Sequence, residues 1–342
     1  MARGERGRNR VRERLETLAD ARLDAEQAQH VAIDVLRPAI GFERWCWPLT
    51  DPSSALSNGG TAEFDLWSEV PRIATLEEHG DVTSKPRLVL GAHASASLHA
   101  ATGGDLARSR RWRECLQPYG VGDELMTVCR DHHGCWGSVE LMRDSDDAPF
   151  SDDEVHFLHE LAPLLATLVR RSAFLQWHGD DESSEPPPAT LIVDAGFRLT
   201  SWTPAAHRWL AELPPAVYEI TARVLTPPDA ATGLPATVRM RTGAGRWVTL
   251  EGAPLEGADQ GAVVITIRAS EPAEIFDLLC RAHDLTRRER QLAALILEGL
   301  ATKQLAAALC ISPHTVQDHL KSIFAKTGLH SRRELASHLT GR

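Results

Sequence analysis

The chain has 342 residues, of which 43% are hydrophobic and 25% are charged, a composition typical of a globular protein with two or three domains. No apolar run has the length that a membrane-spanning helix needs, and the arginine-rich start has no apolar segment behind it, so neither a membrane segment nor a secretory signal is expected. Six cysteines over this length do not make a disulfide framework, which favours a cytoplasmic protein with reduced thiols.

The first half of the chain predicts an α+β domain over residues 20–172, behind a disordered or helical extension over residues 1–19. Residues 1–10 have the composition of a disordered segment, and a helical pattern follows from residue 11 until Pro38. Residues 42–49 alternate like a strand, and residues 124–142 read as a hairpin. Ser151 and Glu154 have the spacing of a capping box, which begins a long helix through residue 171.

A second, smaller α+β domain is expected over residues 190–268. A linker precedes it at residues 173–189, where acidic residues and serines are followed by three prolines. A strand pair, a helix that begins at Thr203-Pro204 and three further strands then follow, with a turn at 243–245 between the first two of these strands. Residues 269–283 have the pattern of a helix that connects this domain to the C-terminal region.

Four short helices are predicted over residues 284–342, which makes an all-α unit. Two capping boxes, at 286–289 and 331–334, begin the first and the last of them. Ser312 and Pro313 suit the N-cap and first position of the third helix, and the short break at 310–312 suits the turn of a helix-turn-helix. The third helix has one apolar stripe and one polar face; the stripe comprises Val316, Leu320, Ile323 and Phe324, and the face comprises His314, Gln317, Asp318 and Lys321.

Charge sets this C-terminal unit apart from the rest of the chain. Residues 281–342 hold ten Lys and Arg against five Asp and Glu, whereas the whole chain has a net charge of −10. Three of the four lysines lie in this unit, and the fourth is Lys85. A basic module on an acidic protein is the electrostatic signature of phosphate binding, so double-stranded DNA is the expected partner.

The C-terminal pattern resembles the DNA-binding domain of LuxR/FixJ-type transcription regulators. The residues that carry the resemblance are Leu285-Thr286-x-x-Glu289, Gly299-x-x-Thr302-Lys303-x-Leu305-Ala306, Ile311-Ser312-x-x-Thr315-Val316-x-x-His319 and Lys326-x-Gly328. Related domains often have Lys at the position of Gln317 and an apolar residue at that of Asp318, so a different target sequence is expected. The resemblance implies a transcription regulator in which the third helix enters the major groove.

Side-chain chemistry assigns expected roles on this helix. Gln317 suits adenine and Lys321 suits guanine, whereas Asp318 suits cytosine or repels incorrect registers. Phosphate contacts, which give affinity and register, are expected from the flank of the helix and from the helix before it. These expected phosphate contacts are Lys303, Thr315, His319 and Lys326, and His314 completes the expected DNA-binding set.

The N-terminal domain resembles the GAF-like sensor domains found beside LuxR-type modules, mostly in actinobacterial regulators. The segments that carry the resemblance are residues 45–52, 103–108, 112–114, 135–137 and 149–154. Residues 190–268 resemble a small PAS domain through Asp194-x-Gly196 and the proline-capped helix. The GAF-like resemblance implies small-molecule sensing, and the two resemblances together imply the input region of a one-component regulator. The expected ligand pocket is lined by tryptophans, namely Trp45, Trp47, Trp112 and Trp136.

Other functions were weighed against this interpretation. Cys129 and Cys135 flank His132-His133 and suggest a metal or oxidant sensor, but the spacing is not that of a zinc pair, so no metal site is predicted. His93 and His99 are haem-ligand candidates whose plainer interpretation is structural, and no cofactor is predicted. Control by a protein partner, with ligand-free sensor domains, is the remaining alternative. No catalytic or nucleotide-binding motif occurs, so the chain is not expected to be an enzyme.

The expected protein is therefore a homodimer, because one recognition helix reads few base pairs and paired half-sites multiply the contacts. Its operator is expected to be pseudo-palindromic. A small-molecule effector is expected as a further partner, and RNA polymerase is a candidate partner at the promoter.

Overall fold

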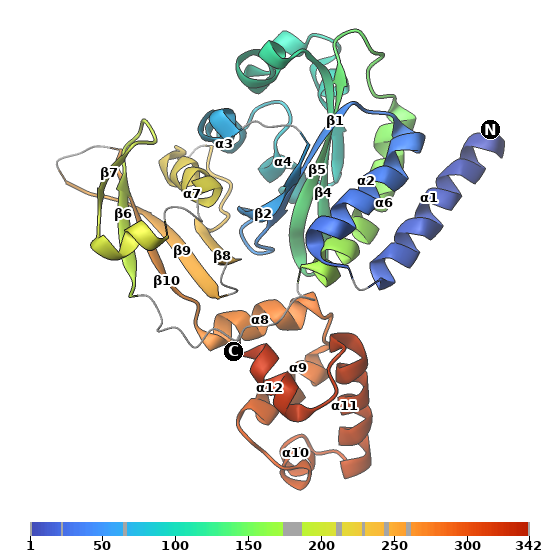
Figure 1. Ribbon diagram of the computed structural model, residues 1–342, viewed down its shortest axis with the longest axis vertical. Helices are drawn as coiled ribbons and strands as arrows, with labels where there is room; N and C mark the ends of the chain where they lie inside the picture. Colours follow the sequence, from blue (N-terminus) through green and yellow to red (C-terminus); the bar gives the residue numbers. More distant parts are fainter. Residues whose placement is uncertain are drawn as a thin grey trace. The chain divides into compact units, whose positions relative to one another are not determined.

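The computed structural model describes residues 2–21, 23–63, 67–173, 187–209, 214–227, 230–242, 246–257 and 261–340. The chain divides into two compact units, of which the first holds both β-sheets and the second holds the C-terminal helices from residue 270 onward (Figure 1). The expected multidomain class is confirmed: two α+β sheet domains precede an all-α C-terminal region. The predicted limits of the individual domains stay predictions.

The first sheet has five antiparallel strands in the order β2-β1-β5-β4-β3. These strands are β1 (Arg44–Thr50), β2 (Ser57–Ala62), β3 (Ser95–Ser97), β4 (Val121–Asp131) and β5 (Gly134–Asp144). The predicted hairpin is confirmed as β4 and β5, which are longer than the sequence pattern indicated.

Helices α1 (Ala2–Asp20), α2 (Ala25–Ile40) and α6 (Asp152–Ser172) pack together, and α2 and α6 lie on one side of this sheet (Figure 1). The capping box of α6 is present as predicted. The Ser151 side chain accepts a hydrogen bond from the backbone N of Glu154, and the Glu154 side chain accepts one from the backbone N of Ser151. The prediction of disorder at residues 1–10 was wrong for residues 2–10, which belong to α1, where Arg8 stacks on the ring of Phe157. Pro38 does not end the helical pattern either but lies inside α2.

Short helices fill the long connection between β2 and β4, and α3 and α4 lie on the side of the sheet away from α2 and α6 (Figure 1). The elements are the 3-10 helix η1 (Trp67–Glu69), α3 (Val70–Glu78), α4 (Lys85–Leu90), α5 (Leu98–Thr102), the 3-10 helix η2 (Leu106–Arg108), the π-helical turn η3 (Trp112–Leu116) and the 3-10 helix η4 (Gln117–Tyr119).

The second sheet has the order β7-β6-β10-β9-β8, so its five strands follow the same relative order as those of the first. Its elements are β6 (Ala189–Val193), β7 (Leu199–Trp202), the 3-10 helix η5 (Pro204–Arg208), α7 (Pro214–Leu225), β8 (Thr237–Arg241), β9 (Trp247–Pro254) and β10 (Val263–Ala269). Leu191, Ile220 and Ile265 are fully buried at its core. The predicted linker at 173–189 and the turn at 243–245 lie largely or wholly outside the described residues.

The C-terminal unit contains five helices within its described residues. They are α8 (Pro272–Ala282), α9 (Arg287–Leu297), α10 (Thr302–Ala308), α11 (Pro313–Thr327) and α12 (Arg332–Leu339). The predicted connecting helix is α8, and it packs on α12, where the Nε2 atoms of His283 and His338 lie 2.8 Å apart. None of the described helices has both the length and the apolar character needed to cross a bilayer.

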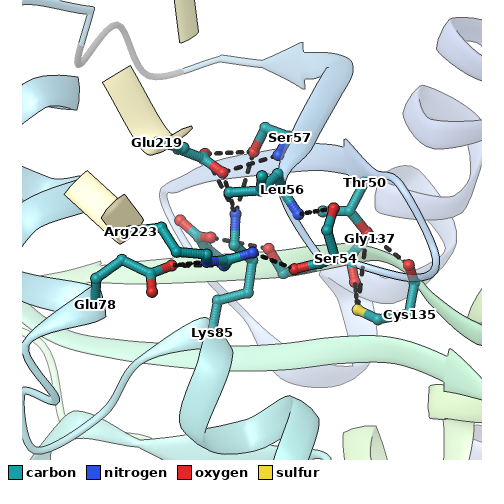
Figure 2. A network of polar contacts seen from close by, with 12 residues as sticks. Thr50, Ser54, Leu56, Ser57, Glu78, Lys85, Cys135, Gly137, Glu219 and Arg223 are labelled. Atoms are coloured by element: carbon teal, nitrogen blue, oxygen red, sulfur yellow. Dashed lines mark hydrogen bonds and ion pairs between the residues drawn. The ribbon is translucent and has the colours of Figure 1, made fainter. Parts of the chain in front are cut away.

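The two sheet domains share a buried polar interface, in which α3 packs on α7 and β2 packs on β8 (Figure 2). Glu219 of α7 accepts hydrogen bonds from the backbone N and the Oγ of Ser57, at 2.8 and 2.6 Å, and its carboxylate lies 3.2 Å from Lys85 Nζ. Arg223, one turn later, donates from Nη2 to Glu78 Oε1 at 2.6 Å.

A third ion pair lies at the strand side of the same interface. Arg239 of β8 donates to both carboxylate oxygens of Asp51, at 2.7 and 2.8 Å. Asp51 is 1% exposed, so its charge depends on this partner for compensation. Each of the three pairs takes its acid and its base from different sheet domains, and the interface therefore holds the domains together.

Arg223→Gln should destabilise the chain by ~3–5 kcal/mol, because it leaves the carboxylate of Glu78 buried without its cation. The measurement is urea unfolding of the full chain followed by tryptophan fluorescence. The matched control is Arg198→Gln, whose guanidinium is 81% exposed and pairs with Asp194, and which should cost less than ~1 kcal/mol. Equal losses in both variants would contradict a structural role for the interface pair.

Candidate DNA-binding face and sensor region

Local sequence signals set both ends of α11. The side chain of Ser312 accepts a hydrogen bond from the backbone N of Thr315 at 3.1 Å, which is the predicted N-cap. Gly328 ends the helix in the left-handed conformation, with φ of 72°. Cys310 also has a positive φ, 53°, in the turn between α10 and α11. The predicted helix-turn-helix is therefore present.

One face of α11 is buried and the opposite face is open. Val316, Leu320 and Ile323 are buried, as the apolar stripe predicted. His314, Gln317, Asp318 and Lys321 are exposed together, whereas Thr315 and His319 are half-buried at the flank and Lys303 is exposed on α10. The structure therefore places the four expected groove-facing residues on one accessible surface, which we call the recognition face.

On the recognition face, Asp318 lies between the imidazole of His314 and the ammonium group of Lys321. Its carboxylate is 3.0 Å from His314 Nδ1 and 3.4 Å from Lys321 Nζ. These contacts are exposed and contribute little to stability. They nevertheless hold Lys321 beside a carboxylate that repels the phosphates of DNA. Asp318 therefore lowers the positive potential of the face that is expected to meet DNA.

Lys326 has a structural role that the sequence did not reveal. Its Nζ donates to Glu289 Oε2 and to the backbone O of Asp284, both at 2.8 Å, and so ties α11 to the start of α9. Glu289 is 3% exposed and also accepts from Ser322 Oγ at 2.6 Å. Burial alone would raise the pKa of Glu289, but the hydrogen bonds from Lys326, Ser322 and Thr286 outweigh it and lower this pKa to about 2. A phosphate contact by Lys326 stays a prediction.

The helix starts around α11 differ in detail from their sequence patterns. Thr286 and Glu289 form the predicted capping box. The N-cap of α10 is Ala301, and the Gln304 side chain accepts a hydrogen bond from its backbone N. Thr302 is the first helical residue, and its Oγ1 accepts from Arg332 of α12. It therefore joins α10 to α12.

The structure places the four expected ligand-site tryptophans on two different faces of the first sheet. Trp45 packs edge-on against His30 of α2, with ring centroids 5.3 Å apart. Trp47 lies two residues after Trp45 on β1, so its side chain points to the same face of the sheet, and it is fully buried. Trp136 Nε1 donates to Asp131, whose other oxygen accepts from Arg170 of α6. These three tryptophans belong to the layer that meets the helices α2 and α6.

Trp112 lies on the opposite face of that sheet. It packs with Leu116, Val121 and Met142, together with Cys46, the residue between Trp45 and Trp47. Its Nε1 donates to the backbone O of Val121 at 2.8 Å. The four rings therefore do not surround one common space, and their assignment as a ligand site stays a prediction.

Buried charges also occupy the Cys46 face of this sheet, and the sequence analysis did not identify them. Arg111 donates from Nη1 to Glu124 Oε1 at 2.8 Å, and both side chains are almost completely buried. Glu140 accepts from the Cys46 thiol at 2.8 Å. Burial raises the pKa of Glu77 to about 8. The available signal was the pair Asp123-Glu124 inside an otherwise apolar strand, since charges in a buried strand require partners.

The thiols weighed for metal or redox sensing are both buried in the sheet. Burial raises the pKa of Cys129 well above its usual range and also raises that of Cys135. Reactive cysteines have a lowered pKa and partial exposure, so this environment does not favour oxidant sensing. His93 is exposed and faces the ring of His159, whereas His99 is half-buried.

Two concave sites lie in the sheet-bearing unit. One has a volume of about 390 Å³ and is lined by residues that include Ala55, Val89, Arg130 and Leu234. The other has a volume of about 670 Å³ and is lined by the end of α3, the loop after it, and parts of residues 87–110. None of the four tryptophans lines either of them. Both volumes fall within the range of small-molecule sites.

Comparison with known proteins identifies the C-terminal region. Residues 283–339 match the family described as "Bacterial regulatory proteins, luxR family". Residues 283–339 are a LuxR-family helix-turn-helix region. Over 51 residues the chain is 55% identical to an HTH-type transcriptional regulator in the exeN 3′ region of Aeromonas salmonicida, and over 59 residues it is 41% identical to the transcriptional regulatory protein UhpA of Escherichia coli. This LuxR-family match is to regulatory proteins and not to enzymes.

These matches cover only the C-terminal part of the chain. They span 15% and 17% of its length, and 26% and 30% of the length of the two relatives. A solved structure described as SdiA in complex with octanoyl-rac-glycerol aligns over 97% of this chain and 94% of its own, with 11% identity and a TM-score of 0.34. A TM-score this low does not establish a shared fold for the sheet domains.

Glu289→Gln should reduce the loss of stability in acid. The pKa of Glu289 is about 2 in the folded chain against 4.5 for an ordinary glutamate, so its carboxylate stabilises the fold above pH 4.5 and this contribution disappears as the pH falls toward 2. The contribution is on the order of 2 kcal/mol after allowance for solvent screening. Thermal unfolding should show the variant less stable than wild type at pH 6, with this difference reduced by about half at pH 3 and nearly gone at pH 2. Glu298→Gln, an exposed change in the same helix region, is the control, and a pH-independent gap would contradict the assignment.

Asp318→Asn should strengthen binding to any duplex, because it removes a negative charge from the recognition face. The expected gain is about three- to tenfold at low salt, and it should shrink as the salt concentration rises. Fluorescence anisotropy with a scrambled duplex measures it. Glu298→Gln makes the same change in net charge outside α11, and an equal gain from that control would place the effect in the net charge rather than on the recognition face.

Proposed function

We propose that the chain is a sequence-specific, DNA-binding transcription regulator controlled by a small molecule in its sheet-bearing unit. The observation that carries the proposal is the LuxR-family region, in which a capped α11 presents four polar side chains on one open face. The basic balance of residues 281–342 supports DNA as the partner. The function places the protein with the chromosome, in the cytoplasm.

The DNA contacts follow from the exposure of each residue. Gln317 and Lys321 read base edges, with His314 and Asp318 beside them on the recognition face. Lys303, Thr315 and His319 contact phosphates, and Lys326 adds a contact only with donors that Glu289 and Asp284 leave free. The regulator acts as a homodimer on a pseudo-palindromic operator, because two such faces are needed for an adequate number of base contacts. RNA polymerase is its proposed partner at the promoter.

A GAF-like identity for residues 20–172 and a PAS-like identity for residues 190–268 are part of the proposal. Each domain has a strand pair, then helices, then three further strands, and the two sheets have the same relative strand order. This shared organisation supports the sequence resemblance. The concave sites of these domains support control by a small molecule, since ligand binding would shift the population between arrangements of the protein.

In vitro selection from random duplexes with the full-length chain tests the proposal. A pseudo-palindromic sequence should be enriched, and Lys321→Ala should then reduce the preference for this sequence over a scrambled duplex by about tenfold or more. Arg14→Ala, on the exposed face of α1, is the control and should leave the preference unchanged. Failure to enrich any sequence, or an equal loss on both duplexes for Lys321→Ala, would contradict sequence-specific binding by α11.

A further inference from the structure

The larger concave site is a groove in the first sheet domain with an unusual set of charges. Its volume is about 670 Å³, and its walls come from the end of α3, the loop at 79–82, α4 and the segment at 101–110. The residues that line it are Leu76, His79, Gly80, Asp81, Val82, Arg87, Ala101, Arg108 and Arg110. Three guanidinium groups and one imidazole therefore share this groove with a single carboxylate.

Within the described residues, that carboxylate forms no ion pair with the three guanidinium groups, because its oxygens accept hydrogen bonds from other donors. Asp81 accepts from Ser109 Oγ at 2.6 Å and from the backbone N atoms of Val82, Arg110 and Arg111, at 2.8, 3.2 and 2.8 Å. Burial would raise its pKa, but these hydrogen bonds outweigh burial and lower it. Asp81 therefore stays ionised and fixes the loop, while its oxygens are occupied by backbone and hydroxyl donors.

The guanidinium groups keep most of their donors. Within the described residues, the Arg87 guanidinium has no hydrogen-bond partner. Arg108 donates from Nη1 to the backbone O of Thr102 at 3.0 Å, and Arg110 donates from Nε to Glu114 at 3.3 Å. Glu114 is shared with Arg72, so it compensates Arg110 only in part. Each arginine has five N–H donors, and the groove therefore offers many that are unused.

We propose that this groove binds a small, multiply charged anion with phosphate or carboxylate groups, and that this anion is the effector; this rests on the proposed function. Guanidinium groups match the geometry of both oxyanions and bind them through paired hydrogen bonds. The volume lies within the range of ligand sites and admits a molecule larger than a simple inorganic ion. Asp81 is half-buried and bonds to the backbone and to Ser109, so most donors of the three exposed arginines remain available to an anion.

The groove is linked to the second sheet domain through the ion pair of Glu78, and to the core of the first sheet through Asp81. Leu76 and His79 line the groove on either side of Glu78, and Glu78 is the residue of α3 that pairs with Arg223 of α7. On the other wall, Asp81 accepts from the backbone of Arg111, whose side chain pairs with Glu124 in the core of the sheet. An anion that draws the arginines together would therefore act on α3 and on the interface between the sheets.

Isothermal titration calorimetry of the full-length chain tests the site, with citrate as the carboxylate probe and inorganic pyrophosphate as the phosphate probe. At constant ionic strength, at least one probe should bind, and Arg87→Gln and Arg108→Gln should each weaken that binding by about tenfold. Arg14→Gln removes the same charge from an exposed position on α1 and should leave the affinity within about twofold, as expected of a substitution far from the site. Circular dichroism confirms that each variant is folded.

The pattern of results distinguishes the two proposals. Binding of pyrophosphate alone identifies a phosphorylated effector, and binding of citrate alone identifies a carboxylate effector. Absence of binding by both probes, or an equal loss in Arg14→Gln, overturns the site. The same samples are titrated with the selected duplex: DNA binding without anion binding refutes only the groove, whereas anion binding without DNA binding refutes only the proposed function.

Discussion

The first unit of the protein depends on charges that are buried where its two sheet domains meet. Lys85, Glu78 and Asp51 belong to the first domain and are each at most 5% exposed, which would be prohibitive without a partner of opposite sign. The second domain supplies these partners as Glu219, Arg223 and Arg239. If the domains separated, each of these charges would lose its partner of opposite sign.

The same principle operates at smaller scale in the C-terminal unit. The carboxylate of Glu289 is buried at the start of α9, and Lys326 and Ser322 of α11 supply its partners. This contact, and the apolar stripe beneath it, fix which side of α11 is covered. The opposite side is left open and polar. The recognition face is therefore a consequence of packing, and the residues proposed to read bases lie on the side of α11 that the core leaves exposed.

The sequence predicted those features whose signals are local. The N-cap Ser312, the Ser151 capping box and the β4–β5 hairpin each depend on a few neighbouring residues, and all are present. The three ion pairs between the sheet domains were not predicted, because their partners lie 134 to 188 residues apart and each residue alone resembles a surface charge. That Lys85 is the only lysine before the C-terminal unit was visible in the sequence, but its partner was not.

The remaining differences have the same origin. Helix α1 was missed at residues 2–10 because its stability comes partly from contacts with α6, such as that of Arg12 with Glu160, and not from its own composition. The tryptophans looked like one group because they are aromatic, but the three on strands share one face of the sheet, whereas Trp112 belongs to the π-helical turn η3 on the other face. The sequence pattern within one helix or strand predicts which of its residues share a face. Which faces then come into contact depends on how several elements pack together.

Hydrogen–deuterium exchange of the full-length chain, with and without its selected duplex, tests the central claim most directly. If α11 reads DNA through its open face, added protection should concentrate at residues 303–321, around the turn, the N-terminus of α11 and the recognition face. Protection confined to the sheet-bearing unit, with residues 303–321 unchanged, would contradict the claim that this helix is the DNA-binding element.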